Sequence, residues 1–91
     1  MKLGGTFMAR LFRYNAEKGA WYFVEVPERL APPVTHAWGR TPVRATVDGH
    51  EWNTSVWRDR KGRTLLAVPA AVRGAKGHGD RVRVRLVFRA L

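Results

Sequence analysis

The 91-residue sequence contains no cysteine and few acidic residues. Without cysteine, a disulfide framework, a thiolate metal site and a cysteine nucleophile are all excluded. The 7 Asp and Glu residues face 17 Lys and Arg residues, which gives a formal net charge of +10. No apolar run has the length of a membrane span, and the polar segment 1–5 does not fit a signal peptide. These absences predict a basic, cytoplasmic protein with no membrane partner.

The composition is nevertheless that of a folded chain. Hydrophobic residues make up 45% of the sequence, and four Trp and four Phe residues are enough for a core. A chain of this length forms one domain, and one compact barrel or sandwich can bury its modest core. We therefore predict a single domain over residues 1–91, with residues 1–5 as a flexible N-terminus.

The clearest structural pattern lies near the C-terminus. Arginine alternates with apolar residues from Arg81 onward, directly after glycines at 77 and 79. Because successive side chains of a strand point to opposite faces, Arg81, Arg83 and Arg85 are expected to face water or an anionic partner. The apolar residues between them are expected to be buried.

Five earlier segments also have the composition of strands, namely residues 6–13, 20–26, 43–47, 51–57 and 63–68. Turns are expected at 15–19, at Asp48-Gly49, which is a strong hairpin signal, and at 59–62. Prolines favour short helical turns at 27–31 and 69–73. We expect an irregular loop over 32–42, in which Trp38 closes one end of the core. Six strands predict an all-β fold, a small closed six-stranded β-barrel with one or two short helical turns, because closure removes exposed sheet edges.

Short motifs in a fixed order carry a resemblance to a known family. They are Phe7-x-Ala9-x-Leu11, Trp21-x-Phe23-Val24-x-Val26-Pro27, Val43-Arg44-Ala45-Thr46-Val47-Asp48-Gly49, Trp52-Asn53-Thr54-Ser55-Val56, Leu65-Leu66-Ala67-Val68 and Gly79-Asp80-x-Val82-x-Val84. Their order and spacing, from about residue 6 to residue 88, resemble an uncharacterised bacterial domain-of-unknown-function family. Its members occur alone or fused to a bacteriocin-protection domain of the YdeI/OmpD-associated type. The resemblance implies a closed barrel of the double-psi kind and no catalytic residues.

Candidate catalytic groups are sparse. The three histidines do not have metal-ligand spacing, and no carboxylate pair is placed for acid–base work. Glycines at 74, 77 and 79 precede a strand, whereas a dinucleotide-binding loop precedes a helix. A weak cluster of His50, Asp48 and Thr54 at the expected hairpin keeps an enzyme as a third hypothesis. We predict no catalytic residue, no metal and no cofactor.

The excess of arginine favours nucleic acid or another polyanion as the ligand, although a GC-rich or thermophilic genome also produces such an excess. The candidate polyanion-binding residues, all on expected outer faces, are Arg44, Arg63, Arg81, Arg83, Arg85 and Trp57. Further aromatic residues that could stack on bases are Trp21, Tyr22 and Trp38. Packing in the core is the alternative role for most of them.

Two classes of function therefore remain ahead of an enzyme. The first is a non-enzymatic domain that binds nucleic acid or another polyanion. The alternative, which the family resemblance suggests, is a protein-interaction or accessory module in bacteriocin or stress tolerance. A continuous arginine face beside an exposed Trp57 would favour nucleic acid, and a broad apolar patch would favour a protein partner.

Overall fold

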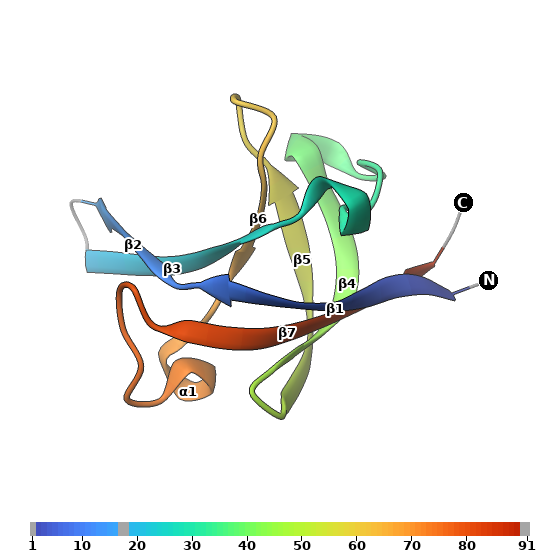
Figure 1. Cartoon of the computed structure of the whole chain (residues 1–91). Coiled ribbons are helices and arrows are strands. Elements are labelled where there is room, and N and C mark those ends of the chain that lie inside the picture. The colour runs from blue at the N-terminus through green and yellow to red at the C-terminus, as the bar shows by residue number, and fades with distance from the viewer. Residues whose placement is uncertain (1, 17–18, 90–91) are drawn as a thin grey trace.

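A computed structural model describes residues 2–16 and 19–89 (Figure 1). The described chain forms one antiparallel sheet with the strand order β1-β7-β4-β5-β6-β3-β2. The strands are β1 (Lys2–Arg10), β2 (Phe12–Ala16), β3 (Gly19–Val26), β4 (Arg40–Val47), β5 (His50–Arg58), β6 (Thr64–Ala67) and β7 (Arg81–Arg89). Three short helical segments connect them, η1 (Glu28–Leu30), η2 (Ala37–Gly39) and α1 (Ala70–Arg73). No helix in the described ranges is long and apolar enough to cross a membrane.

The sheet is an open half-barrel of seven strands, so the prediction of a closed six-stranded barrel is wrong. The segment 6–13, predicted as one strand, is divided between two: residues 6–10 belong to β1 and residues 12–13 belong to β2. These two strands form the two edges of the sheet. Leu11 separates them because its backbone bonds to the loop before β7: Leu11 N–H donates to Asp80 and Leu11 C=O accepts from Gly79. Figure 1 shows β1 beside β7, with β4, β5 and β6 crossing them and β3 returning past β1.

Strand β1 begins at Lys2 and thus includes residues 2–5, for which the sequence predicts a flexible N-terminus. Gly4 explains how this end of β1 approaches β7. Its φ is +146°, and a Cβ on this residue would lie 1.9 Å from the carbonyl oxygen of Leu86. Glycine weakens the strand pattern in the sequence, but here it is the residue that permits the pairing.

The segment before β4 also differs from the prediction. Strand β4 starts at Arg40 and includes Pro42, which the sequence places in an irregular loop. β7 pairs with β4 only over Arg44–Val47, so Pro42 has a single partner strand and needs no second ladder bond. Trp38 does not close the core. Trp38 is 86% exposed, and its backbone has a left-handed φ of 67° within η2.

The remaining elements follow their patterns. Asp48 and Gly49 have φ values of 47° and 87°, as a tight two-residue hairpin turn requires. η1 and α1 lie inside the two predicted helical segments. The alternation along β7 is confirmed: its arginines are exposed, and Val82, Val84, Leu86 and Phe88 are buried. Val87 interrupts the outward arginines and is half-buried. The core consists of Phe7, Leu11, Val24, Val26, Val43, Ala45, Val47, Val56, Leu66, Val68, Val82, Val84, Leu86 and Phe88.

Candidate nucleic-acid interface

Four arginines form a continuous surface on the outer side of β1 and β7. We call Arg10, Arg81, Arg83 and Arg85 the arginine row; all four are exposed. Arg10 lies opposite Arg81 in the strand pairing, and Met8 and Thr6 lie opposite Arg83 and Arg85. Among the described residues, none of the four takes part in a salt bridge. The arginine row is therefore a concentration of positive charge that carboxylates do not neutralise.

Arg44, another of the predicted residues, lies on the outer side of the neighbouring strand β4. It donates to Asn53 at 2.8 Å and forms an ion pair with Glu51 at 2.6 Å, both on β5. Its charge is thus partly compensated within the sheet. Arg44 extends the arginine row in position, but it is less available to an external anion.

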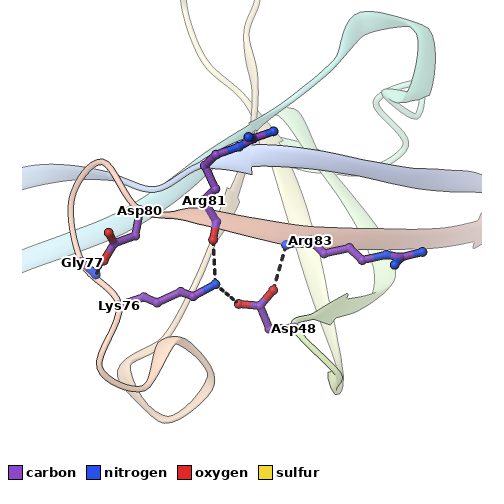
Figure 2. Close-up of polar contacts among 6 residues, drawn as sticks. All are labelled: Asp48, Lys76, Gly77, Asp80, Arg81 and Arg83. Atoms are coloured by element: carbon purple, nitrogen blue, oxygen red, sulfur yellow. Dashed lines mark hydrogen bonds and ion pairs between the residues drawn. The ribbon is translucent and has the colours of Figure 1, made fainter.

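Backbone contacts hold β7 in place without using its guanidinium groups (Figure 2). Asp48 accepts from the Arg83 N–H at 2.8 Å, and its second oxygen accepts from Lys76 Nζ at 2.7 Å. Lys76 also donates to the carbonyl of Arg81 at 2.7 Å. Figure 2 shows the Arg81 and Arg83 side chains extending away from these contacts. We call Asp48, Lys76 and the β7 backbone groups they contact the Asp48 clasp.

The Asp48 clasp lowers the pKa of the Asp48 carboxyl group. The hydrogen bonds from the Arg83 N–H and then from Lys76 stabilise the ionised carboxylate, and they hold the pKa of Asp48 below its ordinary value. Both carboxylate oxygens are occupied in this structural role.

The hypothetical cluster of His50, Asp48 and Thr54 is not assembled. His50 and Thr54 lie four residues apart on β5, which separates them by about 13 Å along an extended strand. Within the described ranges no three His, Asp or Glu residues are grouped as a metal site would require. The described residues therefore do not form the cluster on which the enzyme hypothesis is based.

A second surface lies on the outer side of β2, β3, β5 and β6. It is a groove of about 400 Å³ lined by Tyr14, Trp21, Phe23, Trp57, Leu65 and Ala67. We call it the aromatic groove. Strand pairing brings these residues together, with Tyr14 opposite Trp21, Phe23 opposite Ala67 and Trp57 opposite Leu65. Tyr14, Trp21 and Trp57 are exposed by 61%, 57% and 40%, so their rings are accessible to a ligand.

Two arginines lie against aromatic rings at this surface. The guanidinium carbon of Arg40 is 6.0 Å from the ring centroid of Trp57, and that of Arg63 is 5.9 Å from the ring of Phe12. Phe12 in turn lies 5.8 Å from Phe23, between centroids. Arg63 also forms an ion pair with Asp59 at 2.8 Å. The charge of Arg63 is thus partly compensated, like that of Arg44, and Arg40 supplies positive charge at the border of the groove.

The structure divides the predicted polyanion-binding residues between the two surfaces. Arg81, Arg83 and Arg85 belong to the arginine row, with Arg44 beside it, whereas Arg63 and Trp57 belong to the border and wall of the aromatic groove. A further depression of about 470 Å³ lies between them; its lining includes Met8, Arg10, Phe12 and Arg63. The predicted residues thus do not form one continuous arginine face beside Trp57, the arrangement that would favour nucleic acid most directly.

Sequence reasoning missed Arg10, Tyr14, Phe23 and Arg40, and it included Tyr22. Tyr22 lies on the core side of β3, where Arg73 covers its ring at 3.8 Å. A signal for Tyr14 and Phe23 was present. Aromatic residues occupy alternate positions on both sides of a predicted hairpin, at 12 and 14 before it and at 21 and 23 after it. Once the strands pair, all four side chains lie on one face.

A family model described as a domain of unknown function, DUF1905, matches residues 7–86. The chain belongs to the DUF1905 family. This confirms the resemblance to an uncharacterised domain family. No curated protein matches the chain. The DUF1905 match runs from β1 to β7 and includes every residue of the arginine row and of the aromatic groove.

Proposed function

We propose that this DUF1905 domain binds nucleic acid and that the arginine row contacts the phosphate backbone. The observation that carries the proposal is the row itself: four exposed arginines on two paired strands, none of them in a salt bridge within the described chain. Alternate residues of β7 are about 7 Å apart, so its three arginines can contact successive anionic groups of an extended polymer.

The chemistry of arginine suits this ligand. A guanidinium group presents several N–H donors in a plane and binds phosphate oxygens in a bidentate manner. The net charge of +10 attracts a polyanion from a distance. Arg10 and Arg81 are directly opposite each other, and like charges in that position repel. A bound phosphate would relieve this repulsion.

Fluorescence anisotropy with labelled single-stranded DNA, duplex DNA and RNA tests the proposal. Between about 50 and 300 mM salt, the logarithm of the affinity should fall linearly with the logarithm of the salt concentration. Arg83→Ala and Arg85→Ala should each weaken binding and reduce that slope by about 1. Arg44→Ala is the matched control, because it removes the same charge from an arginine already paired with Glu51.

The proposal fails if binding disappears by about 150 mM salt, where nonspecific attraction is already weakened by screening. It also fails if Arg44→Ala weakens binding as much as the two arginine-row variants do, since net charge alone would then explain the attraction.

The alternative is a protein-interaction module, and the aromatic groove favours it because exposed apolar patches often bind partners. A bacterial origin and a link to bacteriocin tolerance belong to this alternative and rest on the family resemblance. The proposed cytoplasmic location rests on the absence of cysteine. Partner capture that depends on Trp21 and not on Arg83 would support this alternative.

A further inference from the structure

We propose that the aromatic groove binds unpaired bases, so that the domain prefers single-stranded over duplex nucleic acid. This inference rests on the proposed function, because it assumes that the phosphates lie along the arginine row. It assigns a separate role to residues of β2, β3, β5 and β6, which the phosphate contacts do not use.

The groove has the composition of a base-stacking platform. Tyr14, Trp21 and Trp57 present partly exposed rings from three strands, and Phe23 lies stacked beside Trp21 with an interplanar angle of 17°. Stacking on such rings tolerates any base, because every base has a planar π face. The groove volume of about 400 Å³ is within the range of sites for small planar ligands.

The charges around the groove favour a nucleic acid over an apolar protein segment. Arg40 lies over Trp57 and Arg63 over Phe12, and none of the residues that line the groove is acidic. A base bound between the rings would bring its phosphate close to these guanidinium groups. A second copy of this chain is a poor occupant, because it would bring another net charge of +10 to the same face.

One chain segment connects the two surfaces. Met8, Arg10, Phe12 and Tyr14 follow one another at alternate positions from β1 into β2, and the first three line the depression between the arginine row and the groove. Arg63 lines it as well, and Glu25 is its one acidic residue within the described chain. A single strand can therefore continue from β7 past Arg10 and Arg63 to the aromatic rings. A duplex cannot use the groove in this way, because its bases are already paired and stacked.

Anisotropy with a labelled oligothymidine, which has no internal pairing, and with a duplex of equal length distinguishes the two surfaces. Trp21→Ala and Tyr14→Ala should each lower the affinity for the single strand at least ~5-fold, as expected for the loss of one stacked base. They should change the duplex affinity less than ~2-fold and leave the salt slope unchanged, since no phosphate contact is lost. Arg83→Ala should weaken binding of both ligands.

Trp38→Ala is the matched control, because Trp38 is 86% exposed and lies in η2, outside the groove. It should leave both affinities unchanged. Trp21→Phe should restore most of the single-strand affinity, and circular dichroism would establish that each variant is folded. Quenching of tryptophan fluorescence by the single strand should be reduced in Trp21→Ala.

Other outcomes overturn the inference. If Trp21→Ala and Tyr14→Ala have no effect, or affect single strand and duplex equally, the groove does not bind bases, while the arginine row can still bind phosphate. If the wild type is a dimer by sedimentation and Trp21→Ala is a monomer, the groove is a protein interface. If the wild type binds neither nucleic acid, the proposed function fails and this inference fails with it.

Discussion

The carboxylate of Asp48 accepts a hydrogen bond of 2.8 Å from the backbone N–H of Arg83, 35 residues further along the chain. This bond joins the turn between β4 and β5 to the strand that carries most of the arginine row. Lys76 strengthens the connection by donating to both Asp48 and the Arg81 carbonyl. The clasp fixes the position of β7 through backbone groups, so the guanidinium groups of Arg81, Arg83 and Arg85 stay available. The Arg10 guanidinium donates to the Gly79 carbonyl at 3.0 Å.

Asp48→Ala should lower the free energy of unfolding by about 2 kcal/mol. The change removes the acceptor for the Arg83 N–H and the Lys76 ion pair, and charge-assisted hydrogen bonds contribute ~1.5–3 kcal/mol. We take the lower part of that range because the Asp48 side chain is 31% exposed. Asp48→Asn is the control, because asparagine tolerates the positive φ and keeps an acceptor. It should cost less than about 1 kcal/mol in urea denaturation; equal losses in the two variants would contradict the role of the Arg83 contact.

Stability should fall at acidic pH in a way that depends on Asp48. The folded state lowers the pKa of this carboxyl group, so its contribution is fully present above the unfolded-state pKa of about 3.9. It is lost as the pH falls through the lower folded-state value, because the unfolded chain then binds the extra proton. The difference in unfolding free energy between wild type and Asp48→Asn should be constant near neutral pH and shrink below about pH 4. A difference that grows on acidification would contradict the lowered pKa.

Gly4→Ala should destabilise the fold by about 1–3 kcal/mol, as overpacking of a close contact does. The added Cβ would meet the Leu86 carbonyl oxygen at 1.9 Å, at a backbone φ of +146° that alanine rarely adopts. Gly77→Ala is the control, because a Cβ there meets no atom within 4 Å. It should change thermal stability by no more than about 0.5 kcal/mol. Equal effects at the two positions would mean that the β1–β7 approach is not tight at Gly4.

Arg81→Thr should stabilise the free domain by ~0.2–1 kcal/mol at low salt. Arg81 lies directly opposite Arg10 on β1, and the substitution removes that repulsion while keeping a residue that favours strands. The gain should disappear at high salt, where exposed charges are screened. Arg44→Thr, which breaks an ion pair with Glu51, should give no gain. If Arg81→Thr destabilises the domain at all salt concentrations, the opposing arginines do not repel.

Sequence patterns predict the structure best where a feature depends on a single strand or turn. The alternation of arginine and apolar residues over Arg81–Leu86 places those side chains correctly, because a strand has only two faces. The Asp48-Gly49 turn follows from the same local logic. Neither the open sheet nor the break at Leu11 follows from alternation, because Leu11 keeps the buried register of Phe7 and only its hydrogen bonds to Gly79 and Asp80 interrupt the strand.

The aromatic groove depends on strand pairing and could be predicted only in part. Trp57 and Trp21 could be named as candidates, but their meeting requires β6 to lie between β3 and β5. The sequence predicts that Trp38 closes one end of the core, whereas the structure exposes it in the left-handed turn of η2. The groove that includes Tyr14 therefore depends on which strands pair, and local sequence patterns do not predict that pairing.

The pairing of Lys2 with Arg89 has a practical consequence for how the chain can be reconnected. Because β1 and β7 are antiparallel neighbours, the two ends of the described chain lie close together in space (Figure 1). A short glycine-rich linker could join them, and new termini could be opened in the exposed turn at residues 60–62. Such a circular permutant would keep every strand pair of the sheet, and it would place a fused fluorophore or affinity tag at a turn outside the aromatic groove and the arginine row.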